Sequence, residues 1–138
     1  MYNEMSIRFI SKRNNIAVIR NMISAMIVEY NPTVTYLNEL KTVISEAITN
    51  CIVHGYDNKE DKYIDININV DFSKICIDII DYGKGIEDIE KAKEPLYSTK
   101  KDEERSGLGF TIMEMFTDLL VVNSSLEKGT EVYFEKKW

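Results

Sequence analysis

The longest regular pattern of apolar positions in the chain lies between residues 35 and 54. Apolar side chains recur there at steps of three and four residues, at Leu40, Val43, Ile44, Ala47, Ile48, Cys51 and Ile52. This spacing is typical of an amphipathic helix that buries one stripe of its surface. Gly55 follows the pattern directly, so we expect it to end the helix as a left-handed cap.

A similar pattern predicts an earlier helix over about residues 15–30. Asn14 or Asn15 can cap its start with a side-chain oxygen. Asn31-Pro32 ends it, because the residue before a proline is disfavoured in the helical conformation. A third, shorter helix is expected over residues 108–118.

Alternating apolar and polar residues predict strands. The runs with this pattern are residues 5–9, 63–70, 74–81, 119–122 and 129–135. Short polar segments separate the second run from the third and the fourth from the fifth. Each of these two pairs is therefore expected to form an antiparallel hairpin.

The predicted elements follow the order β-α-α-β-β-loop-α-β-β. Strands paired in hairpins and helices grouped together favour an α+β fold, a two-layer sandwich with helices on one face of a mostly antiparallel sheet. A length of 138 residues fits one domain over residues 1–138. Residues 82–107 form a long charged loop with three glycines, and loops of this length are usually functional lids or disordered.

Three polar residues form a second stripe on the helix of residues 35–54. Glu46, Asn50 and His54 recur at four-residue steps, so they lie on one side of it. A carboxylate there can accept a proton from an attacking hydroxyl, and an amide oxygen can ligate Mg²⁺. A solvated helix face is the alternative interpretation of the same stripe.

A carboxylate at the end of one strand is expected to point into the helix layer. Asp81 shares its parity with the apolar residues of its strand, and a buried carboxylate needs hydrogen-bond donors. The donor could be a backbone amide or tyrosine hydroxyl, or a ligand amine such as that of adenine. Gly83 and Gly85 follow and allow a flat ligand to approach the backbone. Thr130, by the parity of its own strand, faces the same side as Asp81.

The start of the third helix is a candidate anion site. Ser106, Gly107 and Gly109 are small residues that expose the free backbone amides of a helix N-terminus, which can hold phosphates. Nearby cations, Lys100, Lys101 and Arg105, could close over those phosphates, although a solvated loop would contain them equally well.

Composition excludes several classes of protein. A net charge of −6 disfavours direct binding to nucleic acid, which needs clustered cations. No apolar run approaches the length of a membrane span, and the N-terminus shows no signal peptide. Cys51 and Cys76 both fall in apolar patterns, so we expect two core thiols in a reducing cytoplasm. One histidine and no Cys-x-x-Cys leave no ligand set for a structural zinc.

Together these motifs resemble those of the GHKL, or Bergerat-fold, ATP-binding superfamily, which includes gyrase, histidine kinases and the ninety-kilodalton chaperone. Glu46-x3-Asn50-x3-His54 is similar to its N box, and Asp81-Tyr82-Gly83-Lys84-Gly85 to its Asp-x-Gly-x-Gly box. Gly107-Leu108-Gly109 resembles its second glycine box, and Gly129-Thr130 its final Gly-Thr. The four motifs occur in the order of the superfamily.

Within that superfamily the chain most resembles the sporulation anti-sigma F factors, small serine protein kinases of spore-forming bacteria. Residues 43–47, 54–56, 94–97 and 104–114 carry this resemblance, which extends along essentially the whole chain. The family implies a dimeric kinase that binds its sigma factor in the ATP-bound state. It also implies that a serine of a small anti-anti-sigma protein is phosphorylated, with ATP and Mg²⁺ as cofactors.

The resemblance also implies roles for individual residues. Glu46 would be the general base and Asn50 the Mg²⁺ ligand, while Asp81 would bind the adenine amino group beside Gly83 and Gly85. Thr130 would join the adenine network. Arg105 would reach the terminal phosphate, whose surroundings Ser106, Gly107 and Gly109 would shape. Arg20 would lie at the partner surface, and His54 would have no catalytic role.

Two other functions remain open at this point. One is a nucleotide-gated module that sequesters a sigma factor without transferring phosphate, which would not need a base at Glu46. The other is a detached catalytic domain of a histidine kinase. It is disfavoured because the chain's one histidine, His54, lies in the N-box helix rather than on a separate dimerisation helix pair.

Overall fold

The computed structural model describes residues 2–94 and 109–138. Its strands are β1 (Tyr2–Ile10), β2 (Tyr63–Asp71), β3 (Lys74–Asp81), β4 (Leu119–Ser125) and β5 (Gly129–Lys137). Its α-helices are α1 (Asn15–Met26), α2 (Val34–Asn50), α3 (Ile89–Ala92) and α4 (Gly109–Met115). A short 3₁₀ turn, η1 (Val28–Tyr30), follows α1, and a π-helical turn, η2 (Cys51–Gly55), follows α2.

The described strands form a five-stranded sheet in the order β1-β2-β3-β5-β4, and every neighbouring pair is antiparallel. The last hairpin is inserted so that β5 pairs with β3. This pairing places Thr130 directly opposite Asp81. The predicted α+β sandwich with a mostly antiparallel sheet is therefore confirmed.

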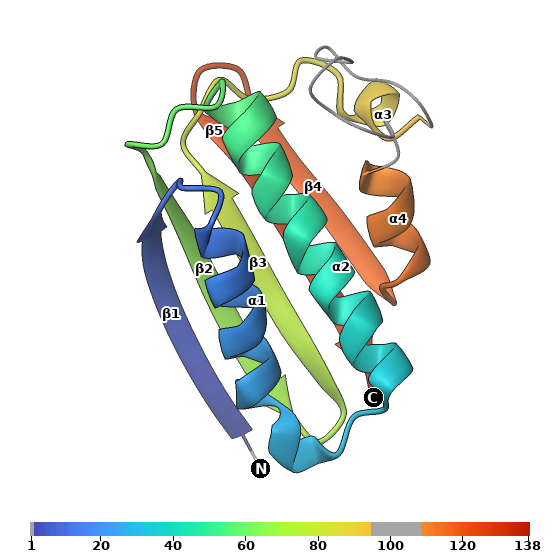
Figure 1. Ribbon diagram of the computed structural model, residues 1–138. Coiled ribbons are helices and arrows are strands. Elements are labelled where there is room, and N and C mark those ends of the chain that lie inside the picture. The colour runs from blue at the N-terminus through green and yellow to red at the C-terminus, as the bar shows by residue number, and fades with distance from the viewer. Residues whose placement is uncertain (1, 95–108) are drawn as a thin grey trace.

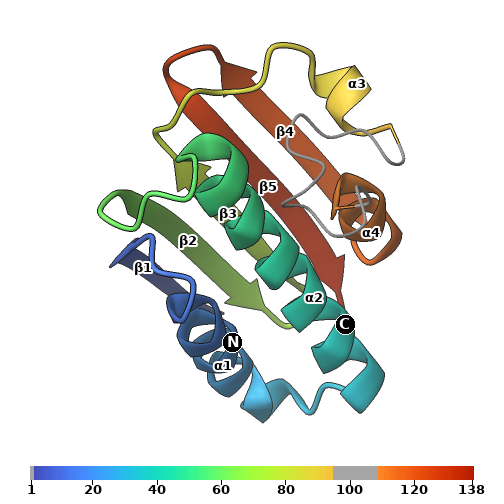
Figure 2. The same ribbon diagram turned by 45° about the horizontal axis from the view of Figure 1, so that its top comes forward.

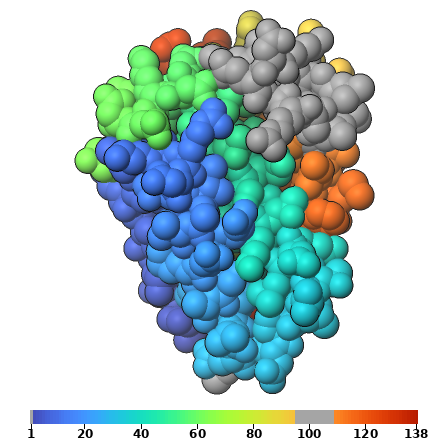
Figure 3. Space-filling view, viewed as in Figure 1, coloured from blue at the N-terminus to red at the C-terminus, as the bar shows by residue number. Residues whose placement is uncertain are grey.

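The helices of the described residues all lie on one face of the sheet (Figures 1 and 2). The core fills the space between α1, α2 and the sheet, with Phe134 and all the isoleucines of β2 and β3 except Ile80 buried. On β2 and β3 the residues of one parity are buried and those of the other are at least partly exposed. β5 follows the same alternation from Glu131 onward. The outer surface of this layer is formed by α1 and α2 side by side (Figure 3). Within the described part of the chain, no helix is long and apolar enough to cross a membrane.

The first two helices differ in detail from the prediction. The α-helix expected over residues 15–30 ends at Met26 and continues as the tighter turn η1, which Asn31 terminates in the left-handed conformation. Asn14 occupies the cap position without a side-chain cap bond, and the side-chain amide of Asn15 instead donates to the Ile10 carbonyl at 2.9 Å. Thr33 caps α2 by accepting from the Tyr36 amide.

One further expectation is wrong. Cys51 is buried, but Cys76 is only partly buried and lies on the sheet face away from the helices, because its parity is opposite to that of Ile75 and Ile77. An apolar side chain on an alternating strand can belong to either face, so hydrophobicity alone did not place this thiol. β1 is an edge strand in which Ile7 and Phe9 are partly buried against the core, while most of its other residues are exposed.

Candidate functional site

The polar stripe of α2 lies on the side of that helix that faces α4, so solvent does not surround it completely. Glu39 forms an ion pair with Lys136 at 3.0 Å, and the same amine donates at 2.7 Å to the carbonyl of Phe116, just after α4. Seven residues span nearly two helical turns, so Glu46 lies on the same side of α2 as Glu39, with Asn50 one turn further. Both are partly buried. Figure 1 shows α4 beside this part of α2.

Asp81, at the end of β3, is buried at 4% exposure. Its Oδ1 accepts from the Gly83 amide at 2.9 Å. Burial raises the pKa of Asp81, and hydrogen bonds from the Gly83 amide, the Cys51 thiol and the Thr130 amide oppose that increase. Because Cys51 follows Asn50 directly, these contacts bring the end of α2 next to the end of β3.

The turn η2 is joined to residues 81–85 through backbone contacts. The Gly55 carbonyl accepts from the Lys84 amide at 3.0 Å. The Tyr56 hydroxyl accepts from the Tyr82 amide at 2.7 Å and donates to the Tyr63 carbonyl at 2.5 Å. Burial raises the pKa of Tyr56 to about 12, so this hydroxyl keeps its proton. The helix end and the glycine turn therefore form one unit.

Gly55 has a different role from the predicted left-handed cap. It does not have a positive φ. A Cβ on Gly55 would lie 2.8 Å from Asp81 Oδ1, and one on Gly83 would lie 2.0 Å from the Gly55 carbonyl oxygen. Of the two glycines in the turn, Gly85 has the positive φ, 78°, and a Cβ there would lie 2.2 Å from the Ser125 carbonyl. The absence of these side chains allows the two segments to touch.

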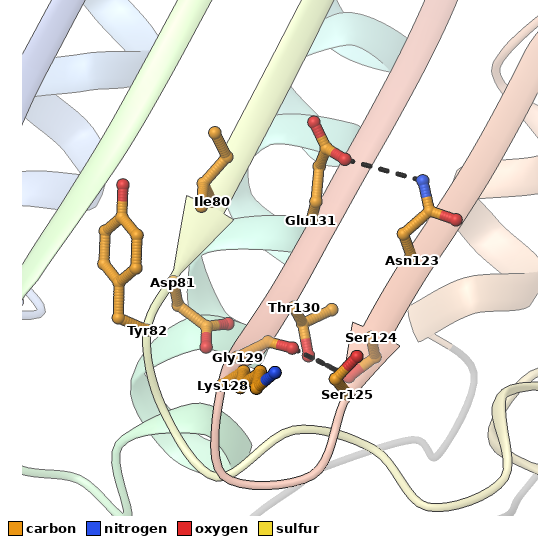
Figure 4. A pocket seen from close by; sticks show the side chains of 10 residues that line it. All are labelled: Ile80, Asp81, Tyr82, Asn123, Ser124, Ser125, Lys128, Gly129, Thr130 and Glu131. Carbon is orange, nitrogen blue, oxygen red and sulfur yellow. Dashed lines mark hydrogen bonds between the residues drawn. The ribbon is translucent and has the colours of Figure 1, made fainter.

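Thr130 belongs to a third group of contacts. Its hydroxyl lies 2.8 Å from the Ser124 hydroxyl, drawn as a dashed line in Figure 4. The Ser124 hydroxyl also donates to the Gly129 carbonyl at 3.0 Å and accepts from the Ile86 amide at 2.7 Å. Ser124 thus connects the start of β5 to the segment that follows Gly85.

The remaining predicted site residues are found in different places, and some of them lie outside the described part of the chain. Gly109 is buried at the start of α4. Arg105, Ser106 and Gly107, with the nearby lysines of the same segment, lie outside the described residues. Arg20 lies on α1, where its guanidinium donates to the Ser45 hydroxyl at 3.2 Å.

A pocket near this site opens on the opposite face of the sheet. It has a volume of about 200 Å³ and is lined by residues 80–82, 123–125 and 128–131 (Figure 4). Ile80, Asn123 and Glu131 face it, and their parity is opposite to that of Asp81 and Thr130. It is smaller than most ligand pockets, about 300–1,000 Å³, and we do not assign the site to it.

The polar groups on the helix side of the sheet suit a nucleotide. The Asp81 carboxylate is an acceptor that can hold an amino group of a base, and the flanking glycines leave the backbone accessible. Among the described residues there is no group of three or more histidine, cysteine or acidic side chains that could hold a metal ion. Mg²⁺ in nucleotide sites usually binds through one or two protein oxygens together with phosphates and water, and Asn50 offers such an oxygen.

Sequence reasoning missed Tyr56 and Ser124. Tyr56 directly follows the His54-Gly55 end of the N box, and Ser124 lies in the last hairpin two residues after a buried valine. The position of Tyr56 after η2 and the strand parity of Ser124 place both residues on the helix side of the fold. Their partners, however, are backbone groups of distant segments, which no local pattern indicates.

Comparisons with known proteins cover nearly the whole chain. A family model described as a histidine kinase-like ATPase domain matches residues 9–136. An anti-sigma F factor of Clostridium botulinum (strain Eklund 17B / Type B) is 48% identical over 136 residues, covering 99% of this chain and 95% of the relative. Anti-sigma F factors of Thermoanaerobacter sp. (strain X514) and Geobacillus stearothermophilus are 46% and 42% identical, over 97% and 100% of this chain and 93% and 94% of the relatives.

Proposed function

The chain belongs to the histidine kinase-like ATPase family and, within it, to the anti-sigma F factors, and from this premise we propose that it inhibits a sporulation sigma factor and phosphorylates a serine of an anti-anti-sigma protein with ATP. The observation that supports this most is the arrangement around Asp81. A buried carboxylate, a threonine paired opposite it and the polar stripe of α2 lie together at one end of the fold.

In this proposal Asp81 and Thr130 recognise the base, with Gly83 and Gly85 holding the turn beside it. Asn50 ligates Mg²⁺, which would neutralise charge on the phosphates. Glu46, one turn earlier on the same stripe, accepts the proton of the attacking serine hydroxyl. Phosphoryl transfer depends mainly on positioning and charge stabilisation, so this short set of side chains suffices.

The phosphate end of the site is assigned to the segment that precedes α4. Arg105 would stabilise charge on the terminal phosphate, and Ser106, Gly107 and Gly109 would shape the backbone around it. Arg20, on α1, would contact the protein partners. We further propose a homodimer that acts in the cytoplasm and binds neither nucleic acid nor membrane directly.

One experiment tests the activity. The protein is incubated with labelled ATP, Mg²⁺ and candidate small partner proteins, and the partner is analysed for phosphoserine. Label on a partner serine supports the kinase. Nucleotide-dependent sigma-factor binding without any label would instead favour the binding module that transfers no phosphate, and label on His54 would favour a histidine kinase domain.

A further inference from the structure

The other hydrogen bonds of Ser124 determine which of the two hydroxyls, that of Ser124 or that of Thr130, is the donor in the contact between them. A serine hydroxyl has one proton and two lone pairs. The Gly129 carbonyl can only accept, so Ser124 gives its proton to that oxygen at 3.0 Å. The Ile86 amide can only donate, so it occupies one lone pair at 2.7 Å.

One lone pair of Ser124 then remains for Thr130. The hydroxyls of Ser124 and Thr130 lie 2.8 Å apart, and either could donate if the pair were considered alone. With the Ser124 proton already used, Thr130 is the donor. The Thr130 oxygen therefore presents only lone pairs to any other group.

We propose that Ser124 is a positioning residue that holds the Thr130 hydroxyl as a hydrogen-bond acceptor toward the bound base, and so favours a 6-aminopurine over a 6-oxopurine. This inference rests on the proposed nucleotide function of the site.

The carboxylate of Asp81, next to Thr130, also favours a 6-aminopurine. Thr130 is paired with Asp81 across β3 and β5 and faces the same side of the sheet. An ionised carboxylate also only accepts. Two acceptors match the two N–H groups of an exocyclic amine, whereas a 6-oxo group would place its oxygen against lone pairs and lose a hydrogen bond.

The test measures preference between nucleotides rather than affinity alone. ADP and IDP are titrated by calorimetry into the full-length protein with Mg²⁺, because neither carries a phosphate that the proposed reaction transfers. Ser124→Ala frees the Thr130 hydroxyl to rotate and donate. It should lower the preference for ADP over IDP by about threefold to tenfold, the range expected for one hydrogen bond.

Three variants separate this role from a merely structural one. Ser125→Ala, on the adjacent exposed residue, should leave the preference unchanged, and Ser124→Thr, which keeps a hydroxyl, should retain it. Thr130→Val should lower the preference by itself, and adding Ser124→Ala to Thr130→Val should lower it no further. General loosening of the hairpin would weaken both nucleotides equally.

The outcomes are distinct. An unchanged preference in folded Ser124→Ala, or in Thr130→Val should Ser124→Ala not fold, overturns the role of Ser124. A wild-type protein that binds neither ADP nor ATP refutes the proposed function itself. A wild-type protein that binds ADP and IDP equally keeps the nucleotide site and refutes the inference.

Discussion

At the scale of single residues, Asp81 shows how burial and hydrogen bonding have opposite effects on a carboxylate. Removing a carboxylate from water disfavours its charged form, so the pKa of Asp81 is raised. A group whose pKa is raised in the folded state stabilises the fold less as the pH rises through that pKa. Ionising Asp81 in the folded protein therefore costs folding free energy.

Asp81→Asn should separate the effect on stability from the effect on nucleotide binding. The amide keeps an oxygen for the Gly83 amide but carries no charge, so the melting temperature should stay the same or rise at pH 7. ATP affinity should fall at least about tenfold, because an acceptor facing the base amine becomes a donor–acceptor group. Thermal unfolding and calorimetric titration measure the two quantities. Parallel losses of stability and affinity would favour a core polar residue without a ligand.

Glu46 tests the chemistry rather than the binding. Glu46→Gln removes the proton acceptor but keeps the shape of the side chain, so it should retain nucleotide affinity and lose at least about 10²-fold in the rate of serine phosphorylation. Glu39→Gln is the matched control, because Glu39 lies on the same side of α2 in an ion pair with Lys136. Single-turnover transfer at the wild-type rate in Glu46→Gln would refute the base.

Asp78 provides a prediction of pH dependence away from the site. Its carboxyl lies on the open sheet face, where burial and the nearby Glu131 raise its pKa to about 7. Stability from its protonated form is present at low pH and is lost as the pH rises from about 4 through 7. Asp78→Asn should therefore increase the melting temperature more at pH 8 than at pH 5.

Asp71 is the control for this measurement, since its shift has the opposite sign. Hydrogen bonds from the hydroxyl and amide of Ser73 lower the pKa of Asp71. Asp71→Asn should thus reduce the melting temperature at neutral pH, with the difference shrinking as the pH falls through the lowered pKa. Equal pH profiles for the Asp71 and Asp78 variants would contradict both assignments.

At the scale of elements, the end of α2 is the feature that local sequence described least well. The apolar spacing predicted a helix over residues 35–54, and the structure follows α2 to Asn50 and then widens into η2. Such π-turns frequently occur at functional sites. The change of pitch directs Gly55 and Tyr56 against residues 81–84, a contact between segments that no helical periodicity encodes.

Tyr56→Phe tests how strongly η2 and the glycine turn depend on each other. The variant leaves the partly buried Tyr82 amide without its acceptor, which should cost about 1–3 kcal/mol in the free energy of unfolding. Tyr82→Phe is the control, because the Tyr82 hydroxyl bonds Asp65 in an exposed cluster and its loss should cost less than about 0.5 kcal/mol. Urea unfolding of both variants gives the comparison. Equal costs would mean that Tyr56 does not brace the turn.

At the scale of the whole molecule, protein partners and nucleotide are assigned to different places. Arg20 lies on α1 with its guanidinium on Ser45, whereas Asp81 lies at the junction of β3 and η2. Arg20→Ala should therefore weaken binding of the sigma factor or the anti-anti-sigma protein at least about tenfold, as for a loss of about 1.4 kcal/mol, and leave ADP affinity unchanged.

Arg13→Ala serves as the control for Arg20. Arg13 precedes α1 and its guanidinium bonds Asn58, so its removal also deletes one exposed cation of the same region. Pull-down with each purified partner and calorimetry with ADP give the two readouts. Equal weakening of partner binding by both variants would indicate a general charge effect instead of a contact at Arg20.

Much of this architecture could be predicted because its signals are local. Alternation placed β3 at residues 74–81 and turned Asp81 and Thr130 to one side, as the structure has them. The insertion of β5 between β3 and β4, the partial exposure of Cys76 and the hydrogen bonds of Ser124 depend on segments far apart in the chain. Those contacts arise from tertiary packing, which a single strand or helix pattern does not contain.

The register between β3 and β5 has a consequence for assembly of the protein. Slipping β5 by one residue would send Thr130 to the far face and set Asp81 opposite a neighbour of different chemistry. A molecule that binds across this pair would therefore recognise correctly aligned chains and ignore misaligned ones. Refolding in the presence of this molecule would favour the native alignment of β5, because binding stabilises only the correctly paired sheet.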